Sequence, residues 1–136
     1  PPRSTLFPYT TLFRSESRTT LLAGYSPDIL PQAREAAGGL FDFILIDGDH
    51  TYQGALRDGL GVLPYAANGA YLLFHDSFFP DVARAIDEVA ERQAHELVDF
   101  GTLTREVTVQ IDSTGRPVEW GGLRLLQVRR GTAFTR

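Results

Sequence analysis

The sequence contains no cysteine, no methionine and no lysine among its 136 residues. Without cysteine it has neither a disulfide framework nor a thiolate nucleophile. No apolar run approaches the roughly 20 residues that a membrane-spanning helix needs. The first residues also lack the charged and apolar regions of a signal peptide. We therefore expect a cytoplasmic protein that makes no contact with a membrane.

Positive charge is also scarce, and arginine alone carries it. The chain has 13 basic and 17 acidic residues and a formal net charge of -4. Binding to nucleic acid needs clustered positive charge, so a nucleic-acid partner is not expected. Hydrophobic residues make up 43% of the chain and charged residues 22%, which is ordinary for a globular protein. The length favours one domain.

The first fifteen residues, PPRSTLFPYTTLFRS, resemble the in-frame translation of a sequencing adapter. Foreign segments of this kind are set aside before a fold is predicted. We expect residues 1–15 to be non-native and to contact the rest of the protein little. Residues 16–136 are then expected to be the C-terminal part of a single domain.

From residue 19 onward, strand and helix patterns alternate. Apolar runs bounded by turn residues predict strands, at 19–24, 41–46, 70–74, 97–100, 107–111 and 123–128. Helical spacing of apolar residues predicts helices at 27–37 and 52–63 and a third that starts at Pro80. Ser26 is the expected N-cap of the first helix, and Gly38 and Gly39 are its expected end. Ser113, Thr114 and Gly115 predict a turn between the last two strands.

This alternation predicts an α/β fold. The run FDFILI at 41–46 is nearly all apolar, which is typical of a strand that is buried on both faces in a parallel sheet. The last two strands predict an antiparallel hairpin. We therefore expect a partial Rossmann-like sheet, mostly parallel, with a C-terminal antiparallel hairpin and without an N-terminal half.

Acidic residues follow two of these strands. Asp47 begins the segment DGDH after the strand at 41–46, and Asp76 closes the pair His75-Asp76 after the strand at 70–74. Ligands of open α/β sheets bind beyond the carboxyl ends of the strands. If the two strands are neighbours, both carboxylates enter one crevice, where a cation such as Mg²⁺ would relieve their repulsion. The alternative is that each aspartate only caps the helix that follows it.

The segment FDFILIDGDHTYQGALRDGLGVLPYAANGAYLLFHD resembles the second half of a class I S-adenosylmethionine-dependent methyltransferase with an IDGDH-type motif. The closing WGGLRLLQV at Trp120–Val128 is similar to the last strand of that family. The resemblance extends over about residues 19–128. It implies a Rossmann-like fold, S-adenosylmethionine as the cofactor and a small molecule as the substrate.

The resemblance also implies roles for single residues. Asp47 stands where metal-dependent sugar and catechol O-methyltransferases have a metal-binding aspartate, and Asp76 matches another acid of that site. His75 is a further candidate ligand, at a position where some relatives have an acid. His50 matches a proposed general base of sugar methyltransferases. Its imidazole could take the proton of a hydroxyl group while the metal stabilises the alkoxide.

The cofactor site is only partly represented in the sequence. Tyr25 stands where many members have an aspartate near the adenine, and the amide of Ser26 could still contact the cofactor there; Asp47 completes the expected cofactor contacts. The family's glycine-rich loop and its acidic ribose-binding residue have no counterpart in this sequence. We therefore expect this chain to bind the cofactor poorly by itself and to self-associate through an open sheet edge.

Other interpretations remain open at this point. His50 could be an ordinary helix-start residue, and Trp120 and the pair Phe78-Phe79 are expected to serve packing. Asp47-Gly48-Asp49 also forms a DxD pattern, which in some glycosyltransferases holds a metal and a nucleotide diphosphate. A non-catalytic α/β binding domain would show the same fold pattern.

Overall fold

The computed structural model describes residues 19–131, and the expectation for residues 1–15 lies outside them. Four strands form one mixed sheet in the order β1-β2-β4-β3. The strands are β1 (Phe41–Ile46), β2 (Ala66–His75), β3 (Leu97–Ile111) and β4 (Pro117–Val128). The helices are α2 (Leu30–Ala37), α3 (Tyr52–Gly61), the 3-10 turn η2 (Leu63–Tyr65) and α4 (Pro80–Arg92).

The sheet confirms the α/β fold and the terminal hairpin. β1 pairs with β2 in parallel, while β4 pairs antiparallel with both β2 and β3. The sheet of the described residues is thus mixed, with one parallel and two antiparallel pairings. The expected strands at 97–100 and 107–111 form one long strand, β3. Its pairing with β4 shifts register at three places between Asp99 and Val107, and these shifts break the alternation that a sequence pattern relies on.

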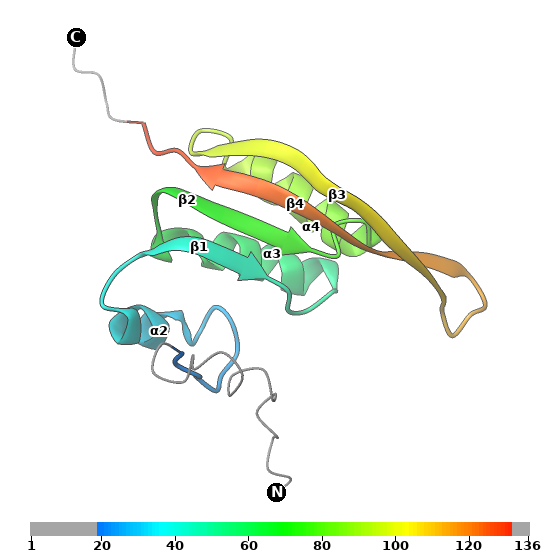
Figure 1. Ribbon diagram of the computed structural model, residues 1–136, viewed down its shortest axis with the longest axis horizontal. Coiled ribbons are helices and arrows are strands. Elements are labelled where there is room, and N and C mark those ends of the chain that lie inside the picture. Colours follow the sequence, from blue (N-terminus) through cyan, green and yellow to red (C-terminus); the bar gives the residue numbers. More distant parts are fainter. Residues whose placement is uncertain (1–18, 132–136) are drawn as a thin grey trace, which may run out of the picture.

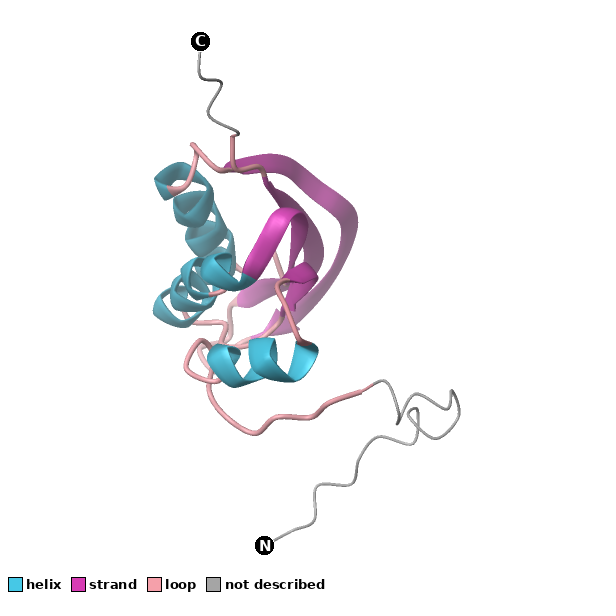
Figure 2. Ribbon diagram, turned by 90° about the vertical axis from the view of Figure 1, so that its left-hand side faces the viewer, coloured by secondary structure: helices cyan, strands magenta, loops and turns pink. Residues whose placement is uncertain are grey.

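Helices α3 and α4 cover one face of the sheet, as Figure 2 shows. The core lies between them and the sheet, and its largest fully buried side chains are Leu72, Phe74, Ile86, Val89, Leu126 and Val128. Gly59 lets α3 approach closely, because a Cβ there would lie 2.8 Å from Cγ2 of Val89. A glycine that lowers the helix propensity of this segment thus serves its packing. No helix within residues 19–131 is long and apolar enough to cross a membrane.

Two predictions near the start of the described chain were wrong. Residues 19–24 form no strand, and Leu21 is 76% exposed. An apolar run makes a strand only where a neighbouring strand takes up its hydrogen bonds. Helix α2 begins at Leu30 and not after Ser26, and its N-cap residue Ile29 provides no side-chain hydrogen bond. The expected stop was confirmed, since Gly38 ends the helix in the left-handed conformation with φ 73°.

Candidate active site at the ends of β1 and β2

The two acidic strand ends lie side by side. Ile46 of β1 is in register with Phe74 of β2, so the chain emerges from both strands at the same edge of the sheet (Figure 1). This is the arrangement that the strand-end pattern predicts for Asp47 and Asp76. Two histidines, His50 from the loop after β1 and His75 from the end of β2, contact both carboxylates.

Asp76 is at the centre of these contacts and is only 8% exposed. Its Oδ1 accepts the backbone N–H of Gly121 at 2.7 Å. Its Oδ2 lies 2.8 Å from Nε2 of His50 and 2.9 Å from Nδ1 of His75. Burial raises the pKa of this carboxyl, but the hydrogen bonds from His50, Gly121 and His75 outweigh it and hold the pKa below its usual value. Asp76 is therefore a carboxylate at neutral pH.

Two glycines of β4 fit closely around Asp76. Gly121 and Gly122 have φ of 96° and 77°, a region that side chains disfavour. Their carbonyls accept the N–H groups of Phe78 and Ser77, respectively. A Cβ at Gly121 would lie 2.6 Å from the carbonyl oxygen of Glu106, so only glycine leaves room here. The segment Trp120-Gly121-Gly122 is thus part of the site, although the sequence indicated only a strand.

Asp47 is the more accessible of the two carboxylates, with 46% of its side chain exposed. Its Oδ1 lies 3.3 Å from Nδ1 of His75 and 3.9 Å from Nε2 of His50. Each imidazole therefore lies within reach of both acids. One oxygen from each of Asp47 and Asp76 and one nitrogen of His50 lie within 4.8 Å of one another, close enough for a single cation. His75, the third expected metal ligand, is beside this group.

Asp49, the second acid of the DxD pattern, has a different role. Its Oδ1 accepts the backbone N–H of Thr51 at 2.8 Å. The hydroxyl of Thr51 in turn accepts the N–H of Gly54 and caps helix α3. Asp49 is outside the group of residues that could share a cation. This contact pattern does not favour a DxD metal site.

Asp47, Asp76, His50 and His75 form one cluster, the acid–histidine group, and neither Tyr25 nor Ser26 is among the residues in contact with its carboxylates. The Tyr25 side chain is 82% exposed. Ser26 instead donates a hydrogen bond that lowers the pKa of Asp58, while burial, the larger influence, raises it. A Cβ at Gly48 would lie 3.0 Å from Oδ2 of Asp58, so this carboxyl supports the loop that carries Asp47. Sequence reasoning missed Asp58, which lies among the apolar positions of α3.

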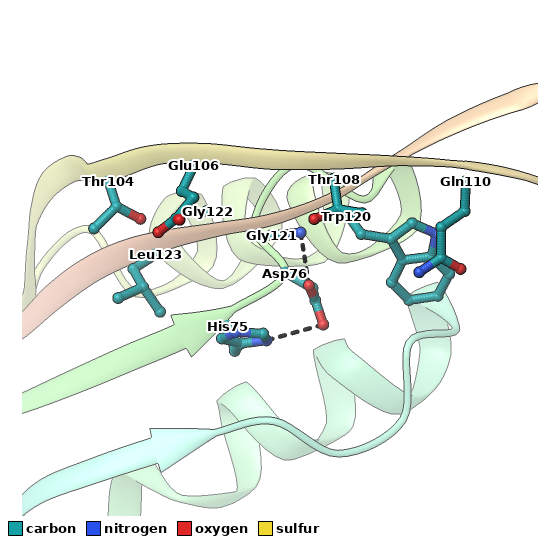
Figure 3. Close-up of a pocket in the computed structure, with 10 residues that line it drawn as sticks. All are labelled: His75, Asp76, Thr104, Glu106, Thr108, Gln110, Trp120, Gly121, Gly122 and Leu123. Carbon is teal, nitrogen blue, oxygen red and sulfur yellow. Dashed lines mark hydrogen bonds and ion pairs between the residues drawn. The ribbon is translucent and has the colours of Figure 1, made fainter.

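An aromatic group borders His50. The ring centroids of His50 and Trp120 are 5.3 Å apart, and those of Phe79 and Trp120 are 4.5 Å apart. Trp120 and Phe79 thus pack against each other, as expected from the sequence. Beyond Trp120 lies an open cavity of about 490 Å³ between β3 and the end of β2, and Figure 3 shows His75 and Asp76 on one of its walls. This volume is within the usual range for small-molecule sites.

Comparisons with known proteins bear on the family and the fold of the chain. Residues 6–77 match a family described as a methyltransferase domain. Among solved structures, the cofactor-bound Rv0187 from MTB aligns with a TM-score of 0.54 and 21% identity, over 90% of this chain and 54% of that chain. An O-methyltransferase from Bacillus cereus in complex with SAH aligns with a TM-score of 0.49 and 19% identity, over 78% and 48%. The chain thus spans about half the length of these structures. None of the curated proteins matches it.

Proposed function

The chain belongs to the methyltransferase domain family, and on that premise we propose that it contributes the acceptor side of an S-adenosylmethionine-dependent O-methyltransferase. The acceptor in this proposal is the hydroxyl group of a sugar or another small molecule. The observation that carries the proposal is the convergence of Asp47, His50 and Asp76 at one sheet edge. Two carboxylates and an imidazole in contact are suited to removing a proton from a hydroxyl group.

His50 accepts the proton in this proposal, and Asp76 positions it. With the Nε2 proton donated to Asp76 Oδ2, Nδ1 is the nitrogen that takes the hydroxyl proton. The carboxylate then stabilises the imidazolium that forms. Bound S-adenosylmethionine would supply the methyl group from its sulfonium, with the thioether sulfur as the leaving group, and His50 and Asp76 would hold the acceptor's proton.

A divalent cation would have suitable ligands at this site. Asp47 and Asp76 would hold it through one oxygen each, and His75, whose Nδ1 lies beside both carboxylates, would offer a nitrogen. Mg²⁺ prefers oxygen ligands, so this mixed set suits Mn²⁺ as well as Mg²⁺. The ion would supply Lewis-acid stabilisation of the acceptor oxygen. Calorimetry with each metal ion tests this part, because Asp47→Asn should weaken binding and Asp49→Asn should not.

The cofactor contacts belong to the same proposal. In this proposal the exposed ring of Tyr25, the backbone amide of Ser26 and the accessible carboxylate of Asp47 contact the cofactor. The family's glycine-rich loop has no counterpart here, so we propose that tight cofactor binding requires that loop upstream of this region. A longer protein with the loop should bind S-adenosylmethionine far more tightly than this chain.

The decisive experiment measures transfer of a labelled methyl group to a panel of sugars and catechols by the longer protein. His50→Ala should lower the rate by about 10² to 10⁴ and leave cofactor affinity unchanged. His95→Ala is the matched control, because His95 is outside the acid–histidine group. Cofactor binding without any transfer would favour a non-catalytic binding domain, and binding of a nucleotide sugar in place of S-adenosylmethionine would favour a glycosyltransferase.

A further inference from the structure

The cavity beside the acid–histidine group has an unusual wall. Four side chains at alternate positions of β3 line it, namely Thr104, Glu106, Thr108 and Gln110, which we call the hairpin row. Figure 3 shows them on β3, on the side of the cavity opposite His75 and Asp76. Every member of the row offers hydroxyl, carboxylate or amide groups for hydrogen bonds. Glu106, Thr108 and Gln110 are exposed and Thr104 is half-buried, so these groups are open to a ligand that enters from solvent.

Trp120 closes one end of the cavity and connects it to the candidate base. The indole lines the cavity, and its centroid is 5.3 Å from that of His50. A ring that rests against Trp120 would therefore lie next to the imidazole. Aromatic faces bind the apolar face of a sugar ring, while its edge hydroxyls remain available to polar side chains. The cavity offers both kinds of contact.

The charges of the lining exclude anionic ligands. Among the described residues that line the cavity there are two carboxylates, Asp76 and Glu106, and no arginine. A phosphate or carboxylate group would be repelled there, because anion sites are built from arginine, lysine or clustered N–H groups. A flat apolar ligand would also leave the hydrogen-bonding groups of the row without partners, which costs free energy when they lose water.

The length of the row indicates the size of the ligand. At about 3.3 Å per residue, the distance from Thr104 to Gln110 along β3 is roughly 20 Å. This is longer than a single pyranose ring. Several hydroxyl-rich rings, placed end to end, would use the whole row.

We propose that this cavity is the acceptor subsite and that it binds a neutral oligosaccharide or glycoside, with Trp120 under the ring that is nearest His50. The inference rests on the proposed function for the identity of the reaction. It adds the substrate class and the residues that select it. Thr108 and Gln110 determine specificity by donating and accepting hydrogen bonds at the sugar edges.

Binding can be measured directly, because Trp120 is the only tryptophan in the chain. Titration with maltotriose or cellotriose, without any cofactor, should give a saturable change in its fluorescence. Glucose 6-phosphate should bind more weakly than the neutral sugars. Thr108→Ala and Gln110→Ala should each weaken oligosaccharide binding by about three- to tenfold, as expected for one lost hydrogen bond.

Thr102→Ala is the matched control, because Thr102 is on the same strand and does not line the cavity. It should leave binding unchanged. The proposal fails if neither trisaccharide binds saturably, if Thr102→Ala and Thr108→Ala have equal effects, or if catechol binds more tightly than the sugars. Oligosaccharide binding without methyl transfer would refute the proposed function alone. Methyl transfer to a different acceptor without oligosaccharide binding would refute the subsite alone.

Discussion

The two faces of the sheet differ sharply in what covers them. On the face under α3 and α4, Leu72, Phe74 and Leu126 are at most 1% exposed. On the opposite face, Phe43 is 58% exposed, Leu45 54% and Tyr71 41%. Strands β1 and β2 carry apolar residues on both faces, as the sequence pattern indicated, but the described helices α3 and α4 cover only one. An apolar run therefore predicts which residues favour burial. Whether they are buried depends on a second layer that packs over them.

The largest expected effect tests this difference with the same substitution on each face. Phe74→Ala should lower the free energy of unfolding by about 3–5 kcal/mol, because it leaves a cavity among close-packed neighbours. Phe43→Ala should change it by no more than about 0.5 kcal/mol, because its ring is mostly solvated already. Urea unfolding at equilibrium measures both. A loss for Phe43→Ala as large as that for Phe74→Ala would mean that the second face is covered in solution.

The exposed face and the free edge of β1 lead to the second prediction, that the chain self-associates. Within the described residues β1 pairs only with β2, so its other edge can accept a strand. Sedimentation should show a mass that rises with concentration. The double substitution Phe43→Glu with Leu45→Lys should weaken association at least tenfold, whereas Val109→Lys, on the hairpin, should not. A wild-type chain that stays monomeric at every concentration contradicts the prediction.

Local sequence signals predicted some parts of this structure well. β1 was predicted to the residue, and the start of α4 at Pro80 and the end of α2 at Gly38 followed from proline and glycine rules. The meeting of Asp47 and Asp76 followed from the strand-end argument. Each of these depends on residues near one another in sequence, or on a general rule of sheet topology.

The parts that were missed depend on contacts between distant residues. The hydrogen bond from the backbone N–H of Gly121 to Asp76 joins residues 45 positions apart, and no local sequence pattern predicts it. The hairpin row was missed because the sequence analysis divided β3 into strands at 97–100 and 107–111, which left Thr104 and Glu106 outside both. Ser26 resembles a helix cap, but in the fold its hydroxyl is close to Asp58. In each case, contacts with residues distant in the sequence determined the structure.

The third prediction concerns Asp58, a buried carboxyl group of helix α3. Asp58 is 6% exposed, and its Oδ1 has no hydrogen-bond partner among the described residues. Burial raises its pKa, so the folded state holds this proton more tightly than the unfolded state. The group therefore lowers stability as pH rises above its unfolded pKa of about 3.9. Asp58→Asn should stabilise the chain by about 1 kcal/mol at neutral pH.

Asp99→Asn is the control for Asp58→Asn, because the pKa of Asp99 is shifted in the opposite direction. Hydrogen bonds and charge from Arg124 outweigh burial and lower the pKa of Asp99, so its contribution is present above pH 4 and is lost as pH falls through the folded pKa. Asp99→Asn should therefore destabilise the chain at neutral pH. The benefit of Asp58→Asn should disappear below about pH 4. A benefit that is independent of pH would show that packing, and not the buried charge, is responsible.

The smallest expected effect lies on the outer surface of the helical layer. Arg92 pairs with Glu88 one turn earlier on α4, and Glu88 also accepts a hydrogen bond from Tyr52 of α3. Exposed pairs of this kind contribute little, so Arg92→Ala should shift the thermal midpoint by no more than about 2 °C. Salt should erase the difference, because it screens exposed charges. A larger shift that persists in high salt would mean that the network of Tyr52, Glu88 and Arg92 holds α3 to α4. Apolar packing against the sheet would then not suffice to explain why this face alone is covered by the described helices.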